Sequence, residues 1–144
     1  MDRTSLETLL RTQMPLAKAM DVRVQRADLD HVELRCHLQT NHNHLATAFG
    51  GSLSTLMMLA SYCWLFQLMN GRGHVVLKSS ALEFLAPVKE DLRAICLPAP
   101  VAARAEFLKA YQKKGKARLN LESQVLLANG KVAARMRGEF VGVS

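Results

Sequence analysis

Residues 51–69 read GSLSTLMMLASYCWLFQLM and contain no Asp, Glu, Lys or Arg. The charge-free region around them extends from Cys36 to Gly71. A helix of this sequence is apolar on all sides, which is typical of a helix covered by other elements in nearly every direction. A membrane span also needs roughly 20 predominantly apolar residues, but Ser, Thr and Gln interrupt this segment and no basic cluster flanks it. We therefore expect a buried central helix and no membrane span.

Alternating apolar and polar residues on both sides of this helix predict β-strands. The alternation is strict in His31–Leu38, where Val32 and Leu34 are expected on the buried face. Further strands are expected at Met20–Arg26, His74–Leu85, Asp91–Leu97, Lys116–Leu127 and Lys131–Val141. Asn129-Gly130 is a hairpin signal that joins the last two strands.

Two other segments complete the expected fold. Thr4–Lys18 is expected to be a helix that starts with a capping box of Thr4 and Glu7 and ends or kinks at Pro15. Ala102–Gln112 is expected to be strand-like and irregular. Segregated helices and strands predict an α+β hot-dog fold, with an antiparallel sheet wrapped around the central helix in a single domain of residues 1–144. Because such a sheet has free edges, we expect a homo-oligomer, either a dimer or a tetramer.

The 144-residue chain carries a formal net charge of +7, and nearly all of this excess lies near its C-terminus. Residues 101–144 hold nine basic and three acidic groups. A basic surface favours an anionic partner, such as nucleic acid, a membrane surface or a phosphorylated small molecule. Aromatic residues make up only 6% of the chain, and no nucleic-acid-binding motif is present, so we expect no nucleic-acid partner.

The three cysteines, Cys36, Cys63 and Cys96, form no CxxC pair and have no short spacing. This argues against a disulfide framework and against a metal knuckle. Reduced thiols in a core, together with an N-terminus that does not resemble a signal peptide, predict a cytoplasmic protein without a metal site.

The polar loop Gln39–Thr47 leads into Gly50 and Gly51 at the start of the central helix. A helix N-terminus offers unpaired N–H groups and a positive dipole end, and glycine lets a ligand approach the backbone closely. The pair could therefore hold an oxygen that gains negative charge, such as a thioester carbonyl under attack. Tight packing at the helix start would explain the two glycines equally simply.

Asn43-x-x-Ala46-x-x-Phe49-Gly50-Gly51 resembles the N-x-x-G-x-x-H-G-G signature of hot-dog acyl-CoA thioesterases of the phenylacetyl-CoA type. The segment Leu82–Pro87 is similar to a strand motif that follows the helix in that superfamily. Asn41-x-Asn43 and Lys78-Ser79-Ser80 look closer to one branch, the thioesterase domain found fused C-terminal to some acetyltransferases.

The resemblance implies a hydrolase for acyl-CoA or acyl-carrier-protein thioesters, with coenzyme A entering as part of the substrate and no separate cofactor. It implies that Asn43 positions the thioester or the attacking water, and that the N–H groups of Gly50 and Gly51 polarise the carbonyl. The substrate-binding residues expected near them are Asn41, Phe49, Ser52 and Ser80.

One departure from the family pattern concerns the catalytic base. The family's carboxylate position is Met58 here, and the helix contains no acid. His44 is the nearest titratable candidate for a general base, with His42 the second choice, and both could instead be solvated loop residues. Direct attack by water needs no nucleophile from the protein. A non-catalytic acyl-thioester binding protein and a hot-dog dehydratase or hydratase remain alternatives.

The basic segment around Lys113 and Lys114 is the expected binding site for the phosphates of coenzyme A. A solvated lysine-rich turn is the alternative interpretation of the same residues.

Overall fold

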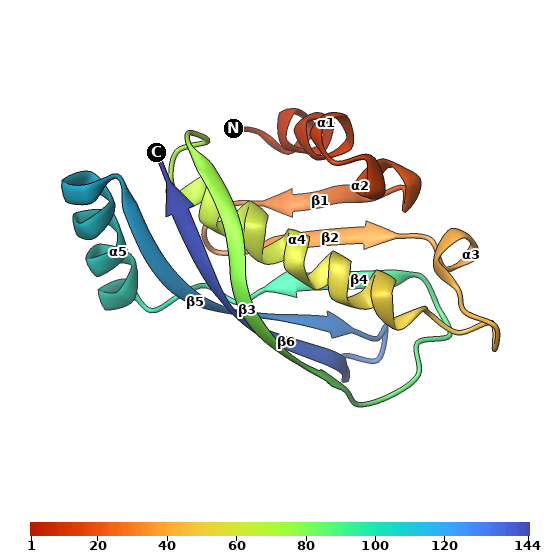
Figure 1. The fold of residues 1–144 in the computed structure, drawn as a ribbon. Helices are drawn as coiled ribbons and strands as arrows, with labels where there is room; N and C mark the ends of the chain where they lie inside the picture. The colour runs from red at the N-terminus through yellow and green to blue at the C-terminus, as the bar shows by residue number, and fades with distance from the viewer.

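The computed structural model describes residues 1–144 as a six-stranded antiparallel sheet wrapped around the long helix α4 (Gly50–Leu68) (Figure 1). The strands follow the order β1-β2-β4-β5-β6-β3 across the sheet. Their bounds are β1 Arg23–Ala27, β2 Val32–Cys36, β3 His74–Phe84, β4 Leu92–Cys96, β5 Lys116–Leu126 and β6 Val132–Val143. The expected hot-dog architecture is therefore confirmed.

Helix α4 forms the centre of the hydrophobic core. Trp64, Leu56 and Met57 are fully buried on it, and the hydroxyl of Ser123 on β5 donates to the carbonyl of Met57 at 2.9 Å. One face, which includes Met58, is only half-buried, and in Figure 1 the helix runs between β3 and the N-terminal helices. None of the helices has both the length and the apolar character that crossing a membrane requires.

The N-terminal helices correct one detail of the sequence prediction. Helix α1 (Arg3–Gln13) is capped by Asp2, whose carboxylate accepts from the backbone N–H of Ser5 at 2.8 Å. The predicted capping box is therefore wrong, because Glu7 instead accepts from the backbone N–H of Val24 at 2.8 Å. As expected, Pro15 ends this helix, and it is the first residue of α2 (Pro15–Ala19).

The prediction of irregular strand for Ala102–Gln112 is also wrong, because this segment lies in α5 (Val101–Lys114). Phe107 is the one buried residue on this helix, and Ala103, Ala110 and Tyr111, at helical spacing around it, are half-buried against the core. The helix ends at Gly115, whose left-handed φ of 67° suits glycine. A short helix, α3 (Leu38–Asn41), also forms at the start of the predicted loop.

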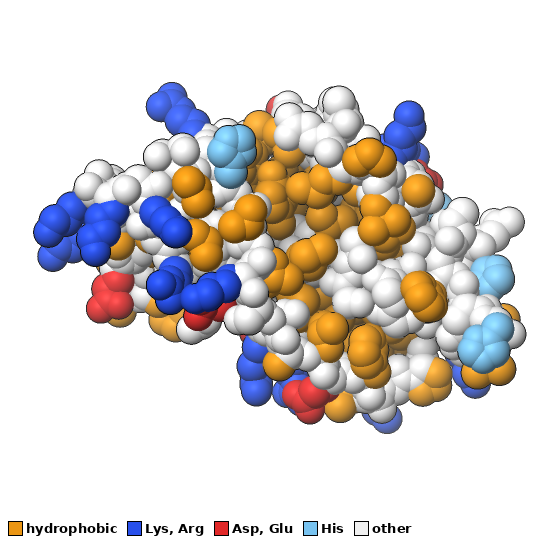
Figure 2. Space-filling model, in the orientation of Figure 1, with side chains coloured by type: hydrophobic (Ala, Val, Ile, Leu, Met, Phe, Trp, Pro, Cys, Tyr) orange, Lys and Arg blue, Asp and Glu red, His pale blue; other side chains and the backbone are white.

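The two edges of the sheet differ. Helix α1 covers the edge of β1, where Glu7 binds the Val24 N–H and Arg3 donates to the Val24 carbonyl at 3.4 Å. No helix or loop forms hydrogen bonds with the outer edge of β3. Large apolar side chains are exposed along and just beyond this strand, at Val76, Leu82, Phe84 and Leu85. Apolar side chains also gather in the middle of the face shown in Figure 2. The sheet can therefore be extended only at β3.

Candidate active site

The N-terminus of α4 is open to a ligand. The N–H groups of Gly50, Gly51 and Ser52 have no acceptor within the protein, and the preceding Phe49 provides no side-chain cap. The first intrahelical hydrogen bond runs from Leu53 N–H to the Phe49 carbonyl, at 3.0 Å. These three donors lie at the positive end of the helix dipole, so the site favours an oxygen that carries negative charge.

Two aromatic rings flank the glycine pair. A Cβ on Gly51 would collide with the ring of Phe49, whereas a Cβ on Gly50 would lie 3.7 Å from Cζ of Phe84, an ordinary contact. Both phenylalanines are 55% exposed. Gly51 is therefore needed for the present position of the Phe49 ring, and both rings border the approach to the free N–H groups.

A hollow of about 340 Å³ lies on each side of the glycine pair. We call the first the apolar hollow, which is lined mainly by Ala48, Leu53, Phe84, Leu85, Pro87 and Val88 and also by Gly50. We call the second the asparagine hollow, which is lined by Leu16, Ala19, Met20, Thr40, Asn41, Phe49, Gly51, Ser52 and Thr55. No ionisable side chain lines either one. Their size lies at the lower end of the range for small-molecule sites.

Asn43 is engaged within its own loop. Its side-chain oxygen accepts from the N–H of Leu45 at 2.8 Å and of Thr47 at 3.2 Å, and its side-chain nitrogen donates to the Thr47 hydroxyl at 2.9 Å. Its neighbour His44 is exposed and forms no hydrogen bond, while His42 Nδ1 lies 2.8 Å from the Asn43 carbonyl. The catalytic roles expected for Asn43 and His44 stay predictions, and neither residue lines the two hollows.

Asn41 connects the loop to the helix start. It is 2% exposed, and its side-chain nitrogen donates to the carbonyls of Met20 at 3.0 Å and His37 at 2.8 Å. Its backbone carbonyl accepts from the N–H of Phe49 at 2.8 Å. The side-chain oxygen has no hydrogen-bond partner. Asn41, Phe49, Gly51 and Ser52 thus come together around one hollow, and their roles toward a substrate stay predictions.

The remaining predicted residues lie elsewhere. Ser80 is exposed in the middle of β3 and borders a different depression, beside Asn120 and Arg137. Lys113 and Lys114 end α5 near the opposite end of α4, since Tyr111 lies beside Gly73, just beyond that helix. A 19-residue helix is about 27 Å long. Within one chain, the two lysines are therefore far from the glycine pair (Figure 1).

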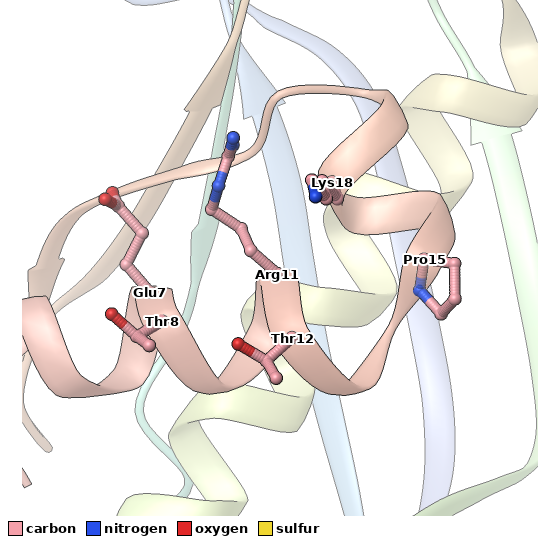
Figure 3. Close-up of a pocket in the computed structure, with 6 residues that line it drawn as sticks. All are labelled: Glu7, Thr8, Arg11, Thr12, Pro15 and Lys18. Atoms are coloured by element: carbon pink, nitrogen blue, oxygen red, sulfur yellow. The ribbon is translucent and has the colours of Figure 1, made fainter.

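The largest hollow, about 600 Å³, lies outside this site, on α1 and α2 (Figure 3). It is lined by Glu7, Thr8, Arg11, Thr12, Pro15 and Lys18. Arg11 turns away from Thr8 and Thr12 and binds Asp21 at 2.6 Å. Because this groove lacks an apolar wall that could desolvate a ligand, we interpret it as polar surface.

Potential nucleophiles and metal ligands are not concentrated at the glycine pair. The three cysteines are buried, and burial raises the pKa of Cys36 and of Cys96 to about 12. Glu83, the nearest acid after the helix in sequence, pairs with Arg135 at 3.3 Å. No group of three His, Cys, Asp or Glu side chains is arranged to hold a metal ion. The chemistry available at this site is therefore hydrogen bonding by backbone and neutral side chains.

A curled antiparallel sheet around an uncapped central helix, with hollows beside a glycine pair, defines a hot-dog protein. Residues 3–144 match the family described as "Putative thioesterase (yiiD_Cterm)", and the chain belongs to that family. No curated protein matches the chain.

Solved structures share the fold over nearly the whole chain. A protein of unknown function from Chlorobaculum tepidum is 25% identical, with a TM-score of 0.89 over 99% of this chain and 94% of that one. A "putative thioesterase" from Shewanella oneidensis is 24% identical, with a TM-score of 0.85 over 99% and 97%. A "probable thioesterase" from Pseudomonas aeruginosa is 21% identical, with a TM-score of 0.85 over 100% and 97%.

Proposed function

We propose that the chain hydrolyses acyl thioesters at the N-terminus of α4. The observation that carries this proposal is the set of free N–H groups on Gly50, Gly51 and Ser52, which lies between two hollows without ionisable groups. The thioester carbonyl oxygen accepts hydrogen bonds from the glycine N–H groups, and the acyl chain occupies the apolar hollow. Membership of a thioesterase family supports this reaction class.

Water is the nucleophile in the proposed reaction. The water oxygen bonds to the thioester carbon, and the carbonyl electron pair moves onto the oxygen that the helix N–H groups hold. When the intermediate collapses, the C–S bond breaks and its electron pair leaves with sulfur, which takes one proton of the former water. The products are a thiol and a carboxylic acid, and the acid releases its proton to solvent.

We propose further that a second copy of the chain extends the sheet across β3. The outer edge of β3 forms no hydrogen bonds, and exposed apolar residues lie along it. β3 begins with His74 near the end of α4 and finishes with Phe84, whose ring lies on the side of Gly50 where a Cβ would project. In an antiparallel β3–β3 pair with a twofold axis at its centre, the first residues of each strand lie beside the last residues of the other. Each glycine pair would then face the first residues of the partner's β3.

This arrangement would give Lys113 and Lys114 a role that they cannot have within one chain. They lie beside the first residues of β3, because Val143 pairs with both His74 and Lys116. In the proposed dimer, the lysines of one subunit approach the glycine pair of the other. The expected substrate is therefore a coenzyme A thioester, with its phosphates at the partner subunit's lysines and its carbonyl at Gly50 and Gly51.

Hydrolysis of an acyl-CoA series from acetyl to palmitoyl, followed by thiol release, tests the reaction. We expect kcat/KM to be highest for the acyl chain whose size best matches the apolar hollow. Binding of a thioether analogue without hydrolysis of any thioester would instead indicate a binding protein. Reversible addition of water to an enoyl-CoA would indicate a hydratase.

A mixture of two defective variants tests the shared site. Gly50→Pro removes a carbonyl-binding N–H, and the double variant Lys113→Glu/Lys114→Glu reverses the charge at the phosphates. Co-expression in equal amounts should restore about a quarter of the intact sites, because half the dimers are mixed and each has one complete site. No recovery would mean that the lysines do not act across the interface. For the double variant alone, kcat/KM for CoA thioesters should fall about tenfold or more. Its kcat/KM for pantetheine thioesters, which lack the nucleotide phosphates, should stay close to that of the wild type.

A further inference from the structure

We infer that the hydroxyl of Ser52 donates a hydrogen bond to the thioester carbonyl oxygen as this oxygen gains negative charge, an inference that rests on the proposed hydrolase function. Ser52 is the third residue of α4 and is only 9% exposed. Side chains on a helix lean toward its N-terminus. The hydroxyl therefore lies on the same side as the free N–H groups of the first turn, where the carbonyl oxygen is proposed to bind.

The Ser52 hydroxyl has no acceptor within the protein, which distinguishes it from the other hydroxyls near the helix start. Ser54 donates to the Gly50 carbonyl at 2.6 Å, and Thr55 donates to the Gly51 carbonyl at 2.8 Å. Ser52 forms no such bond, although it is more buried than either of them. A nearly buried donor without a partner is expected to serve an acceptor that the protein does not supply.

The asparagine hollow gives a ligand access to this hydroxyl. Ser52 lines it beside Gly51, whose free N–H is one of the proposed carbonyl-binding groups. The side-chain oxygens of Asn41 and Ser61 also lack partners, but each has less than 1 Å² of exposed surface, so a ligand reaches neither. The oxygen of Ser52 is not sealed in this way. It is therefore the free side-chain donor that a substrate at the helix N-terminus can contact.

Ser52 would act as a hydrogen-bond donor and not as a nucleophile. A serine nucleophile needs a neighbouring base that takes its proton, and no ionisable side chain lines either hollow. The Ser52 proton therefore stays on its own oxygen throughout the reaction. Its hydrogen bond strengthens when water attacks and the carbonyl oxygen becomes an oxyanion, and it weakens again when the C–S bond breaks. The hydroxyl thus stabilises the transition state more than the substrate, which raises kcat.

Hydrolysis by Ser52→Ala, with the acyl-CoA that the wild type cleaves fastest, tests this inference. The substitution breaks no hydrogen bond within the protein, so the Tm should stay close to that of the wild type. We expect kcat to fall about 100-fold, as for the loss of one oxyanion donor, while KM changes less than about threefold. Ser54→Ala is the matched control: its hydroxyl is bound to the Gly50 carbonyl, and its loss should change kcat less than about threefold.

Two coenzyme A analogues separate the oxyanion from the rest of the substrate in calorimetric titrations. A trifluoromethyl ketone, whose hydrated carbonyl resembles the tetrahedral intermediate, should bind Ser52→Ala about 100-fold more weakly than the wild type. A thioether, which has no carbonyl oxygen, should bind both proteins equally.

An unchanged kcat in Ser52→Ala, or equal losses of affinity for the two analogues, would overturn the inference. An acyl group found on Ser52 by mass spectrometry would overturn it as well, because Ser52 would then be the nucleophile. A wild type that binds the analogues but cleaves no thioester would overturn the proposed function instead, and the two titrations would still decide whether Ser52 contacts the oxyanion.

Discussion

Replacing Gly50 with proline should remove one N–H group from the site and leave the fold intact. Gly50 is the first residue of α4, and its N–H has no acceptor in the protein. Proline is well tolerated at this helical position. The preceding Phe49 has φ −65° and ψ 132°, which is the extended conformation that a residue before proline prefers. The nearest atom to an added Cβ is Phe84 Cζ at 3.7 Å. We therefore expect no steric conflict and a Tm close to that of the wild type.

The expected loss is catalytic. If the Gly50 N–H holds the oxyanion, removing this donor should lower kcat by about 10²–10³, or about 3–4 kcal/mol of transition-state stabilisation. KM should change much less, because the N–H binds the charged intermediate more strongly than the neutral carbonyl. Gly50→Ala is the matched control, since it adds a Cβ in the same place and keeps the N–H.

Thiol release from acyl-CoA gives kcat and KM for both variants, and thermal unfolding monitored by circular dichroism confirms that they fold. A Gly50→Pro enzyme as active as Gly50→Ala would refute the assignment of this N–H as an oxyanion donor. A Gly50→Ala enzyme as defective as Gly50→Pro would show that crowding beside Phe84, and not loss of the donor, causes the effect.

Other predictions concern assembly, acid stability and the thiols. Leu82→Glu should convert dimers into folded monomers in sedimentation velocity, because Leu82 is 40% exposed on the β3 edge; unchanged dimers would argue against this interface. Burial would raise the pKa of Glu33, but hydrogen bonds from Arg35, His31 and Arg93 hold it below its ordinary value of 4.5. Glu33 should therefore stabilise the fold above about pH 4.5, and this contribution should fade as the pH falls through the lowered pKa; urea unfolding of Glu33→Gln should show a weaker acid dependence. The buried thiols, with a pKa near 12 for Cys36 and Cys96, should react with a disulfide reagent at pH 8 only after unfolding, so rapid native labelling would contradict their burial.

The sequence predicted the central features of the fold because those features depend on local patterns. A helix that is apolar on every side must be covered, and the strands that cover it alternate in β5 with side chains such as Leu119 and Leu121 facing inward. Helix α5 was missed because its inward stripe, which includes Ala103, Phe107 and Ala110, consists largely of alanine. Alanines also lie on its exposed side, at Ala102 and Ala105, so the apolar residues show little contrast at helical period.

The candidate site was predictable only where its members are close in sequence. Asn41, Gly51 and Ser52 lie within one loop and the following helical turn, so their proximity follows from local geometry. The position of Lys113 depends instead on the path of β3, β5 and α5 around the far end of α4. Whether the oxygen of Asn41 or of Asn43 is free also depends on partners such as Met20 and Thr47, which a motif does not specify.

The absence of a carboxylate from α4 fits the environment of its first turn. Three free N–H groups and the helix dipole there face two hollows without ionisable groups, and in such low-polarity surroundings hydrogen bonds to a developing oxyanion are stronger than in water. A buried acid near this oxyanion would add a like charge, or it would stay protonated and lose its basicity. The site would thus rely on stabilising the intermediate, while the basic groups expected to bind phosphates lie on α5, away from the glycine pair of the same chain.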